Sequence, residues 1–301
     1  MIDISIIIVN WNTSELLLQC LNSIYDTNPS HETEVIVVDN GSADDSVSMV
    51  EQHFSEVRLI KNDRNVGFAR ANNQGLSIGQ GRYFMLLNSD TIITQGAIDI
   101  LIDIADSHLD LGIVGPQLLN MDGTVQKSWG SFPSFFSELV GKNFRTRHPV
   151  TNVPDAYEVD WVLGACMLIR RKAVAEVGHL DDSYFFYSEE IDWCLRLKKK
   201  NWNIWHLTSA QIYHLGGGST EVGSLAQLVR LYRGKLLYFQ KHHGSFETTL
   251  LRLGLAIGNS LGILRRIIIL NWIYQREALQ RIENQSRLVW CLIWNRYPKI
   301  D

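Results

Sequence analysis

Short apolar runs alternate with stretches of helical periodicity from residue 4 to residue 116. Each apolar run is continuous and rich in β-branched residues, which is typical of strands buried on both faces of a parallel sheet. The predicted strands cover residues 4–9, 34–39, 57–61, 83–87 and 112–116, and the predicted helices cover residues 14–26, 44–54, 67–79 and 94–107. This βαβ series predicts an α/β fold with a mostly parallel sheet flanked by helices.

The alternation weakens between residues 116 and 155, where aromatic residues predict a long loop with some local structure. A further strand is predicted at residues 161–169, and a helix is predicted at about residues 188–200. From residue 244 onward the chain is predicted to form amphipathic helices rather than more of the sheet.

This last segment has the composition of a membrane-surface helix. Residues 253–264 carry no charge, but Arg252 and Arg265 bound them, so the run is shorter than the ~20 residues of a spanning helix. Tryptophans and tyrosines follow among arginines, as in helices that lie in the headgroup region of a bilayer. A helical hairpin packed on the rest of the chain or on a second subunit explains the pattern equally well, so a homo-oligomer stays open.

Charge is distributed unevenly along the chain. The formal net charge is -4, yet residues 1–220 carry 16 Lys and Arg against 27 Asp and Glu, whereas residues 221–301 carry 12 against 5. The basic tail favours a peripheral association with a membrane, and the acidic body argues against a nucleic-acid partner. Because no basic region precedes the first apolar run, we expect the catalytic part to stay in the cytoplasm. The four cysteines are far apart and are expected to be buried thiols.

Polar residues follow each of the first four predicted strands. In an open parallel sheet the ligand crevice lies beyond the carboxyl ends of the strands, so these positions are candidates for binding. Each also suits the start of the next helix, but four in succession favour a shared site. The segments are Asn10-Trp11-Asn12, Asp39-Asn40-Gly41-Ser42, Asn62-Asp63-Arg64-Asn65 and Asn88-Ser89-Asp90.

Two of these segments point to a nucleotide and a metal. Asp90 follows a buried strand, where a rigid carboxylate holds a hard divalent ion such as Mn²⁺ or Mg²⁺ against phosphate oxygens. Asp39 suits a hydrogen bond from a base or a ribose. The small residues Gly67 and Ala71 let a nucleotide approach the backbone, although a helix start with Gly67 near its cap is the plainer alternative.

Two further segments carry acid–base groups. Glu189, Glu190 and Asp192 crowd three carboxylates into one turn after an aromatic run, which raises their pKa values and makes each a candidate general base. An acidic first turn favoured by the helix dipole is the competing account. His214 ends an apolar segment and enters a glycine-rich loop, where it is a candidate metal ligand or phosphate contact, or simply a structural histidine.

Taken together, six segments resemble glycosyltransferase family 2, and specifically its rhamnosyltransferase-like bacterial branch. They are residues 5–12, 37–42, 65–73, 88–90, 161–171 and 185–196. The resemblance implies a GT-A fold, a Rossmann-like sheet, a nucleotide-diphosphate sugar donor, a divalent cation and inversion at the anomeric carbon. We accordingly expect a catalytic domain at residues 1–243, with a donor half at 1–115 and an acceptor half at 116–243, and a helical appendage at 244–301.

The resemblance also assigns roles. It makes Glu190 the base, with Glu189 and Asp192 as neighbours in the same acidic turn, and it makes Asp90 and His214 metal ligands. Asn88 stands where the metal motif has its first aspartate, so it is a weak ligand at best. The donor-binding set is Val9, Asn10, Asn12, Asp39, Asn65, Gly67, Ala71, Asn72, Asn88, Ser89 and Asp90, and the acceptor-binding set is Trp129, Trp161, Gly164 and Ala165.

The implied function is the transfer of a sugar, with dTDP-rhamnose as the favoured donor, to a saccharide or lipid-linked saccharide at the cytoplasmic face of the inner membrane. Such a reaction belongs to cell-surface polysaccharide synthesis. A sugar nucleotidyltransferase is an alternative, but residues 10–15 contain neither the glycine nor the positive charge of its phosphate-binding loop. An inactive, transferase-like scaffold at the membrane is the other alternative, against which Asp90, Glu190 and His214 argue.

Overall fold

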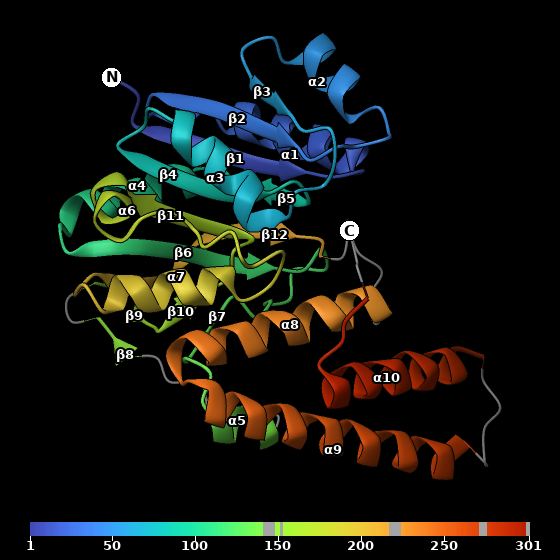
Figure 1. Cartoon of the computed structure of the whole chain (residues 1–301). Coiled ribbons are helices and arrows are strands. Elements are labelled where there is room, and N and C mark those ends of the chain that lie inside the picture. The colour runs from blue at the N-terminus through green and yellow to red at the C-terminus, as the bar shows by residue number, and fades with distance from the viewer. Residues whose placement is uncertain (141–147, 151–152, 217–223, 271–275, 299–301) are drawn as a thin grey trace. The chain divides into compact units, whose positions relative to one another are not determined.

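The computed structural model describes residues 1–140, 148–150, 153–216, 224–270 and 276–298, and side chains except those of 265–270 and 276–279. The chain divides into two compact units. The sheet unit comprises Met1–Phe132, Arg145–Phe185 and Glu189–Ser219, and the helical unit comprises Pro133–Phe144, Phe186–Ser188 and Thr220–Asp301. Figure 1 shows strands flanked by helices in the first unit and helices alone in most of the second.

The sheet unit alternates strands and helices along its first half. These elements are β1 (Ile4–Asn10), α1 (Ser14–Thr27), β2 (Thr33–Asp39), α2 (Ser46–His53), β3 (Arg58–Lys61), α3 (Phe68–Ile78), β4 (Tyr83–Asn88), β5 (Thr91–Ile93), α4 (Ala97–Ser107) and β6 (Leu111–Leu119). The second half contains β7 (Trp129–Gly130), β8 (His148–Pro149), β9 (Ala156–Glu158), β10 (Trp161–Val162), β11 (Cys166–Arg170), α6 (Arg171–Val177), α7 (Glu189–Lys198) and β12 (Asn203–His214).

The main sheet is mixed, and its first four strands along the chain run parallel. Its strands run in the order β3-β2-β1-β4-β11-β6-β12-β9-β8. Strands β1 to β4 pair in parallel with one another, whereas β11 lies antiparallel between β4 and β6. This arrangement confirms the α/β sheet that the apolar runs predict.

The two faces of the sheet bury alternate residues of each strand. In β1, Ile6 and Ile8 belong to the core cluster that also contains residues of α1, α2 and α4. Ile7 points to the opposite cluster, which contains residues of α3, α6 and α7. Because both faces are covered by helices, the strands are apolar at successive positions instead of alternating with polar residues.

The single strand predicted at residues 161–169 is wrong, because the structure divides it into two strands. Trp161 and Val162 of β10 pair with β7 in a separate two-stranded sheet, while β11 joins the main sheet. Between them, the amide of Leu163 donates to the carbonyl of Ser128 and the carbonyl of Ala165 accepts from the amide of Asn88, at 2.8 and 2.9 Å. These bonds turn the chain from one sheet to the other at Gly164.

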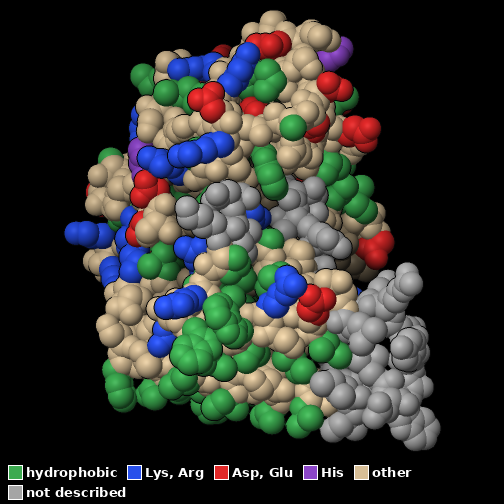
Figure 2. All heavy atoms as spheres, turned by 45° about the vertical axis from the view of Figure 1, so that its right-hand side comes forward, with side chains coloured by type: hydrophobic (Ala, Val, Ile, Leu, Met, Phe, Trp, Pro, Cys, Tyr) green, Lys and Arg blue, Asp and Glu red, His purple; other side chains and the backbone are tan. Residues whose placement is uncertain are grey.

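The helical unit contains α5 (Phe135–Val140), α8 (Leu225–His242), α9 (Ser245–Leu270) and α10 (Arg276–Trp294). Helix α9 packs against α5, α8 and α10. The expected boundary at residues 243–244 falls between α8 and α9, which the contacts place in one unit. No helix within the described residues is long and apolar enough to cross a membrane. Figure 2 shows hydrophobic side chains gathered along the edge that α9 and α5 form.

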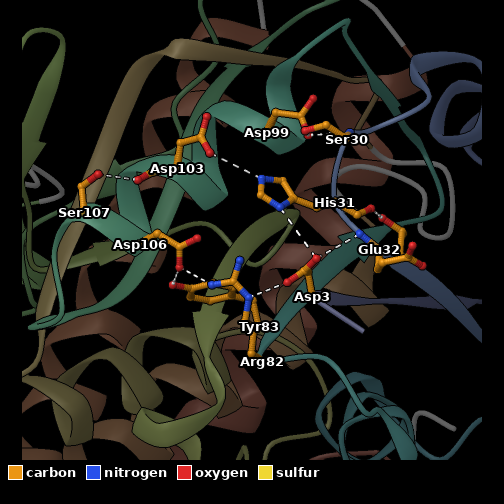
Figure 3. A network of polar contacts seen from close by, with 11 residues as sticks. Asp3, Ser30, His31, Glu32, Arg82, Tyr83, Asp99, Asp103, Asp106 and Ser107 are labelled. Carbon is orange, nitrogen blue, oxygen red and sulfur yellow. Dashed lines mark hydrogen bonds and ion pairs between the residues drawn. The ribbon is translucent and has the colours of Figure 1, made fainter. Parts of the chain in front are cut away.

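A polar network ties together the amino ends of β1 and β4, at the opposite end of these strands from Asn10 and Asn88. Arg82 donates from Nε to Asp3 Oδ1 at 2.6 Å and from Nη1 to Asp106 of α4. His31 lies between Asp3 and Asp103, as Figure 3 shows, at 3.8 and 3.4 Å. The hydrogen bonds from Arg82 are the largest cause lowering the pKa of the Asp3 and Asp106 carboxyls.

We expect Arg82→Ala to lower the free energy of unfolding by about 1 kcal/mol, because the pairs are partly exposed and solvent screens them. A carboxyl whose pKa is lower in the folded state stabilises the fold above its unfolded pKa and stops doing so as pH falls through the folded value. The difference in free energy of unfolding between the wild type and Arg82→Ala should therefore be largest near pH 7 and become smaller below about pH 4. Urea unfolding at both pH values measures it; an equal difference at both would exclude these carboxylates as the cause.

Candidate active site

The site is centred on a carboxylate and an imidazole from distant parts of the chain. Asp90 lies between β4 and β5, and β5 pairs antiparallel with the end of β12, so that Thr91 faces His214. The amide of Leu215 donates to the carbonyl of Asp90 at 2.9 Å. This pairing brings His214 Nε2 to 3.3 Å from Asp90 Oδ1, with both side chains about nine-tenths buried.

A glutamine fixes the orientation of this imidazole. Gln126 donates from Nε2 to the side-chain oxygen of Asn120 at 3.0 Å and to the carbonyl of His214 at 3.2 Å. Its Oε1 therefore faces His214 Nδ1, 2.6 Å away, as an acceptor. Nδ1 then donates a hydrogen bond to Gln126, and in the neutral imidazole this tautomer has its lone pair on Nε2, the nitrogen that lies near Asp90.

In that neutral form, a carboxylate oxygen of Asp90 and the lone pair of His214 Nε2 lie next to each other. A carboxylate oxygen and an imidazole lone pair attract a cation between them, and a metal-bound histidine commonly donates its other ring N–H to an oxygen. Asn88 Nδ2 lies 3.4 Å from the same Nε2, so its amide is a neighbour of the pair. The described residues hold no group of three His, Cys, Asp or Glu side chains able to hold a metal ion. The pair therefore suits an ion whose other ligands come from a substrate and water.

A chain of hydrogen bonds runs from Ser89, the residue before Asp90, to the ends of β1 and β2. Ser89 Oγ lies 2.9 Å from the hydroxyl of Thr13, which donates to Asn10 Oδ1 at 2.7 Å. Asn10 Nδ2 in turn donates to Asp39 Oδ1 at 3.2 Å, and Asp39 Oδ2 accepts from the amide of Ser42 at 3.0 Å. The carboxyl ends of β1, β2 and β4 therefore form one connected surface.

The loops beyond β1 and β2 are also held to each other. Asn12 adopts a positive φ of 53° and accepts a hydrogen bond from the amide of Ala43 at 2.7 Å. Its own amide donates to Ser42 Oγ at 2.9 Å. Val9 is half-buried beside this turn. The predicted donor-binding residues of the first two strands thus lie at or beside two strand ends whose loops are hydrogen-bonded to each other.

The segment before α3 lies close to the aromatic run. Gly67 has a φ of +91°, and a Cβ at this position would meet the carbonyl oxygen of Phe185 at 2.8 Å, so only glycine fits. Asn65 Oδ1 accepts from the amide of Gly67 at 3.0 Å and from Asn40 Nδ2 at 3.0 Å. Inside α3, Ala71 is fully buried, and the buried Asn72 donates to the carbonyl of Phe68 at 2.9 Å.

The acidic turn begins α7 and its three carboxylates differ in surroundings. Glu189 is buried, and its Oε2 has no hydrogen-bond partner within the part of the chain that the structure describes. This burial, with the charge of Glu190 as a second cause, raises the pKa of Glu189 well above its usual range. Asp192 is fully buried and accepts from Arg196 Nε at 2.8 Å. Arg196 donates further to the carbonyls of Val177 and His179, so Asp192 has a structural partner.

Glu190 lies next to the turn between β10 and β11. A Cβ on Gly164 would lie 3.7 Å from the Cβ of Glu190, which places the two residues side by side. Ala165, the next residue, accepts the hydrogen bond from the amide of Asn88. Two residues predicted to bind the acceptor therefore lie between Glu190 and the loop that carries Asp90.

The two predicted acceptor tryptophans belong to the small β7–β10 sheet. Trp161 is buried and donates from its indole nitrogen to the carbonyl of Ser131 at 2.9 Å, while its ring covers Gly130. Trp129 is only partly buried, and its ring centroid is 5.9 Å from that of His206. Trp129 thus retains surface for a ligand, whereas Trp161 mainly supports the small sheet.

The model of glycosyl transferase family 2 matches residues 5–178, which include β1 to β11 and the Asp90 loop. The chain belongs to glycosyltransferase family 2. It is 28% identical over 239 residues to the N-acetylglucosaminyl-diphospho-decaprenol L-rhamnosyltransferase of Mycobacterium tuberculosis, covering 72% of this chain and 78% of that protein. It is 29% identical over 219 residues to the low-salt glycan biosynthesis hexosyltransferase Agl10 of Haloferax volcanii, covering 67% and 64%.

A solved structure confirms the GT-A fold over nearly the whole chain. The mannosyltransferase PcManGT from Pyrobaculum calidifontis, in complex with GDP-Man and Mn²⁺, superposes with a TM-score of 0.59 at 12% identity and covers 98% of this chain and 88% of its own. The family confirms that this chain is a glycosyltransferase. Asn10, Asp39 and Asn88 of this glycosyltransferase lie at the carboxyl ends of the parallel strands β1, β2 and β4, as the alternating pattern predicts.

Three polar residues that organise the site of this glycosyltransferase were not assigned a donor-binding, acceptor-binding, catalytic or metal-binding role from the sequence. Gln126 orients His214, Thr13 links Asn10 with Ser89, and Asn40 accepts from the amide of Val66 at 3.0 Å. Asn40 stands directly beside Asp39 after an apolar run, so it is one of the strand-end positions that the sequence indicates as candidates for binding. Gln126 lies in the segment predicted as a loose loop, where no periodicity or motif distinguishes it.

Proposed function

We propose that this enzyme transfers a sugar from a nucleotide-diphosphate donor to an acceptor hydroxyl, with inversion at the anomeric carbon and with a divalent cation, Mn²⁺ or Mg²⁺, held by Asp90 and His214. The observation that carries the metal assignment is the 3.3 Å approach of His214 Nε2 to Asp90 Oδ1. The hydrogen bond from His214 Nδ1 to Gln126 supports it, because a neutral imidazole that donates from Nδ1 offers the Nε2 lone pair to a metal.

The cation, when bound, neutralises charge on the departing diphosphate. The chain's own residues do the rest. Ser89 and Asn88 line the loop beside Asp90, and the connected turns at Asn10 and Asp39 lie beyond the neighbouring strands, where a nucleoside binds in folds of this kind. The tied loops cost little entropy on donor binding because hydrogen bonds already hold them in place.

Glu190 is the proposed general base. It removes the proton of the acceptor hydroxyl, whose oxygen forms a bond to the anomeric carbon as the bond to the nucleoside diphosphate breaks. Three observations favour Glu190 over Glu189 and Asp192 as the general base. It lies beside Gly164 at the acceptor turn, whereas burial raises the pKa of Glu189 well above its usual range and Asp192 accepts a hydrogen bond from Arg196.

We further propose dTDP-rhamnose as the donor and a lipid-linked saccharide at the cytoplasmic face of the membrane as the acceptor. The similarity to a rhamnosyltransferase over 72% of this chain supports the sugar. The same relative's name includes a diphospho-decaprenol acceptor, which supports a lipid-linked substrate. Trp129 is the aromatic surface proposed to contact the acceptor sugar, because apolar faces of sugar rings pack on aromatic rings.

A panel of nucleotide sugars with Mn²⁺ and an undecaprenyl-diphosphate-linked N-acetylglucosamine acceptor tests this function. We expect dTDP release with dTDP-rhamnose to exceed release with UDP-glucose or GDP-mannose by about a hundredfold, as selective pockets distinguish substrates by a few kcal/mol. Mass spectrometry of the lipid product should show one added deoxyhexose. Turnover of another donor would replace the proposed sugar, and turnover of no donor would favour the inactive scaffold.

A further inference from the structure

One face of α9 is apolar and exposed over most of its described length. Six large side chains on this face are more than two-fifths exposed: Phe246, Leu250, Leu253, Ile257, Leu261 and Leu264. They recur at intervals of three and four residues, so they form one stripe along the helix. The stripe extends over about 27 Å, given a rise of 1.5 Å per residue.

This stripe does not belong to the core of the helical unit. The opposite side of α9 supplies that core, with Leu251, Leu255 and Ala256 buried where α9 packs on its neighbours. The other exposed residues between Phe246 and Leu264 are uncharged as well. A continuous apolar surface of this kind on a soluble protein marks a binding surface.

Helix α5 adds to the same apolar surface. Its Phe136, Leu139 and Val140 are 64%, 39% and 47% exposed. Leu139 lies against α9, because a Cβ on Gly254 would meet Leu139 Cδ2. Two helices therefore share the apolar surface, which is visible along one edge in Figure 2.

Basic residues flank the stripe along the chain. Lys241 and His243 are exposed just before the start of α9, and Arg265 and Arg266 follow Leu264 in the chain. Residues 221–301 as a whole contain 12 Lys and Arg against 5 Asp and Glu. A second copy of this segment would bring like charges together, whereas anionic lipid headgroups complement them.

We propose that the surface formed by α9 and α5 docks on the headgroup region of an anionic bilayer, with the stripe inserted among the acyl chains and the cations at phosphate level. Helix α9 then lies in the membrane plane, because its other side is packed on protein. This inference deepens the proposed use of a lipid-linked acceptor, but its test measures binding without any transfer.

Sedimentation with vesicles of phosphatidylcholine, alone or mixed equally with phosphatidylglycerol, tests the proposal on the full chain. We expect the wild type to bind the mixed vesicles and Leu253→Glu/Ile257→Glu to bind them at least about tenfold more weakly, because each glutamate puts a charge where an apolar side chain inserts. Gln52→Glu/Ser77→Glu, at exposed positions of the sheet unit, adds the same charge and should bind as the wild type does. Binding to phosphatidylcholine alone should be several-fold weaker.

Circular dichroism and donor binding by calorimetry verify that the stripe variant is folded, because neither requires a membrane. Equal sedimentation of wild type and stripe variant overturns the proposal, as does a wild type that ignores both kinds of vesicle. A wild type that is dimeric by light scattering, does not bind vesicles and becomes monomeric in the stripe variant assigns the surface to a second copy instead. A wild type that binds vesicles but turns over no donor would contradict the proposed enzyme mechanism without contradicting the proposed docking surface.

Discussion

Replacing Asp90 with alanine is expected to lower sugar transfer by about 10³-fold and to abolish the metal dependence of nucleoside diphosphate binding. Asp90 Oδ1 lies 3.3 Å from His214 Nε2, so Asp90 is the anionic member of the proposed ligand pair. Its loss leaves one neutral ligand, and a hard divalent ion binds weakly to a lone imidazole. The diphosphate then departs without a neutralising charge.

Calorimetry of dTDP binding, with and without Mn²⁺, measures the first consequence separately from turnover. The wild type should bind more tightly with the metal, whereas Asp90→Ala should bind equally in both conditions. Asp26→Ala removes an exposed carboxylate from α1 and should behave as the wild type does. If Asp90→Ala keeps the metal effect, the metal site lies elsewhere.

Gln126→Leu tests the same proposed metal site and is expected to have a smaller effect than Asp90→Ala. It removes the acceptor for His214 Nδ1 but keeps both proposed ligands. Loss of such a partner commonly weakens metal binding by about 10–100-fold. Transfer by this variant should therefore recover at high Mn²⁺, which a ligand variant such as Asp90→Ala cannot do.

The sheet was predictable because its signal is local. Continuous β-branched runs and intervening helical periodicity reveal strands buried on both faces, and the strand-end rule then identifies Asp39 and Asp90 without any tertiary information. The structure adds that these ends are joined, since Thr13 links Asn10 to Ser89 through two hydrogen bonds. That link depends on side-chain geometry across 76 positions of sequence, to which no periodicity refers.

The region after residue 116 was less predictable for a related reason. Its strands are short, and β10 and β11 enter different sheets within a run that is apolar throughout. An apolar run predicts burial but not the partner strand, so the turn at Gly164 was hidden in what resembled one strand. Gln126 was missed because its role exists only once β5 and β12 pair and bring His214 beside Asp90.

Glu190→Gln is expected to lower transfer by about 10²–10⁴-fold while donor affinity stays within about twofold of the wild type. The amide keeps the shape of the side chain beside Gly164 but accepts no proton from the acceptor. Single-turnover transfer and dTDP calorimetry separate these two effects. A variant that loses donor binding as well would assign Glu190 to the donor site.

Glu189→Gln is the matched control, because Glu189 is buried and this burial raises the pKa of its carboxyl well above the usual range. Transfer should stay within a few fold of the wild type. An acid whose pKa is raised in the folded state takes up a proton on folding, so it costs stability as pH rises above its usual value of about 4.3. The wild type should therefore lose stability relative to Glu189→Gln as pH rises above that value, as urea unfolding over a pH series would measure.

Asp192→Asn distinguishes a base from a structural carboxylate. Asp192 holds Arg196, which in turn binds the carbonyls of Val177 and His179. Its replacement should lower the free energy of unfolding by about 1.5–3 kcal/mol, the usual value of a hydrogen bond to a charged group. Transfer per folded molecule should remain near that of the wild type. Either Glu189→Gln or Asp192→Asn could stay folded and lose transfer while Glu190→Gln keeps it. The residue changed in the inactive variant would then be the general base, because an amide cannot replace the carboxylate that accepts the proton.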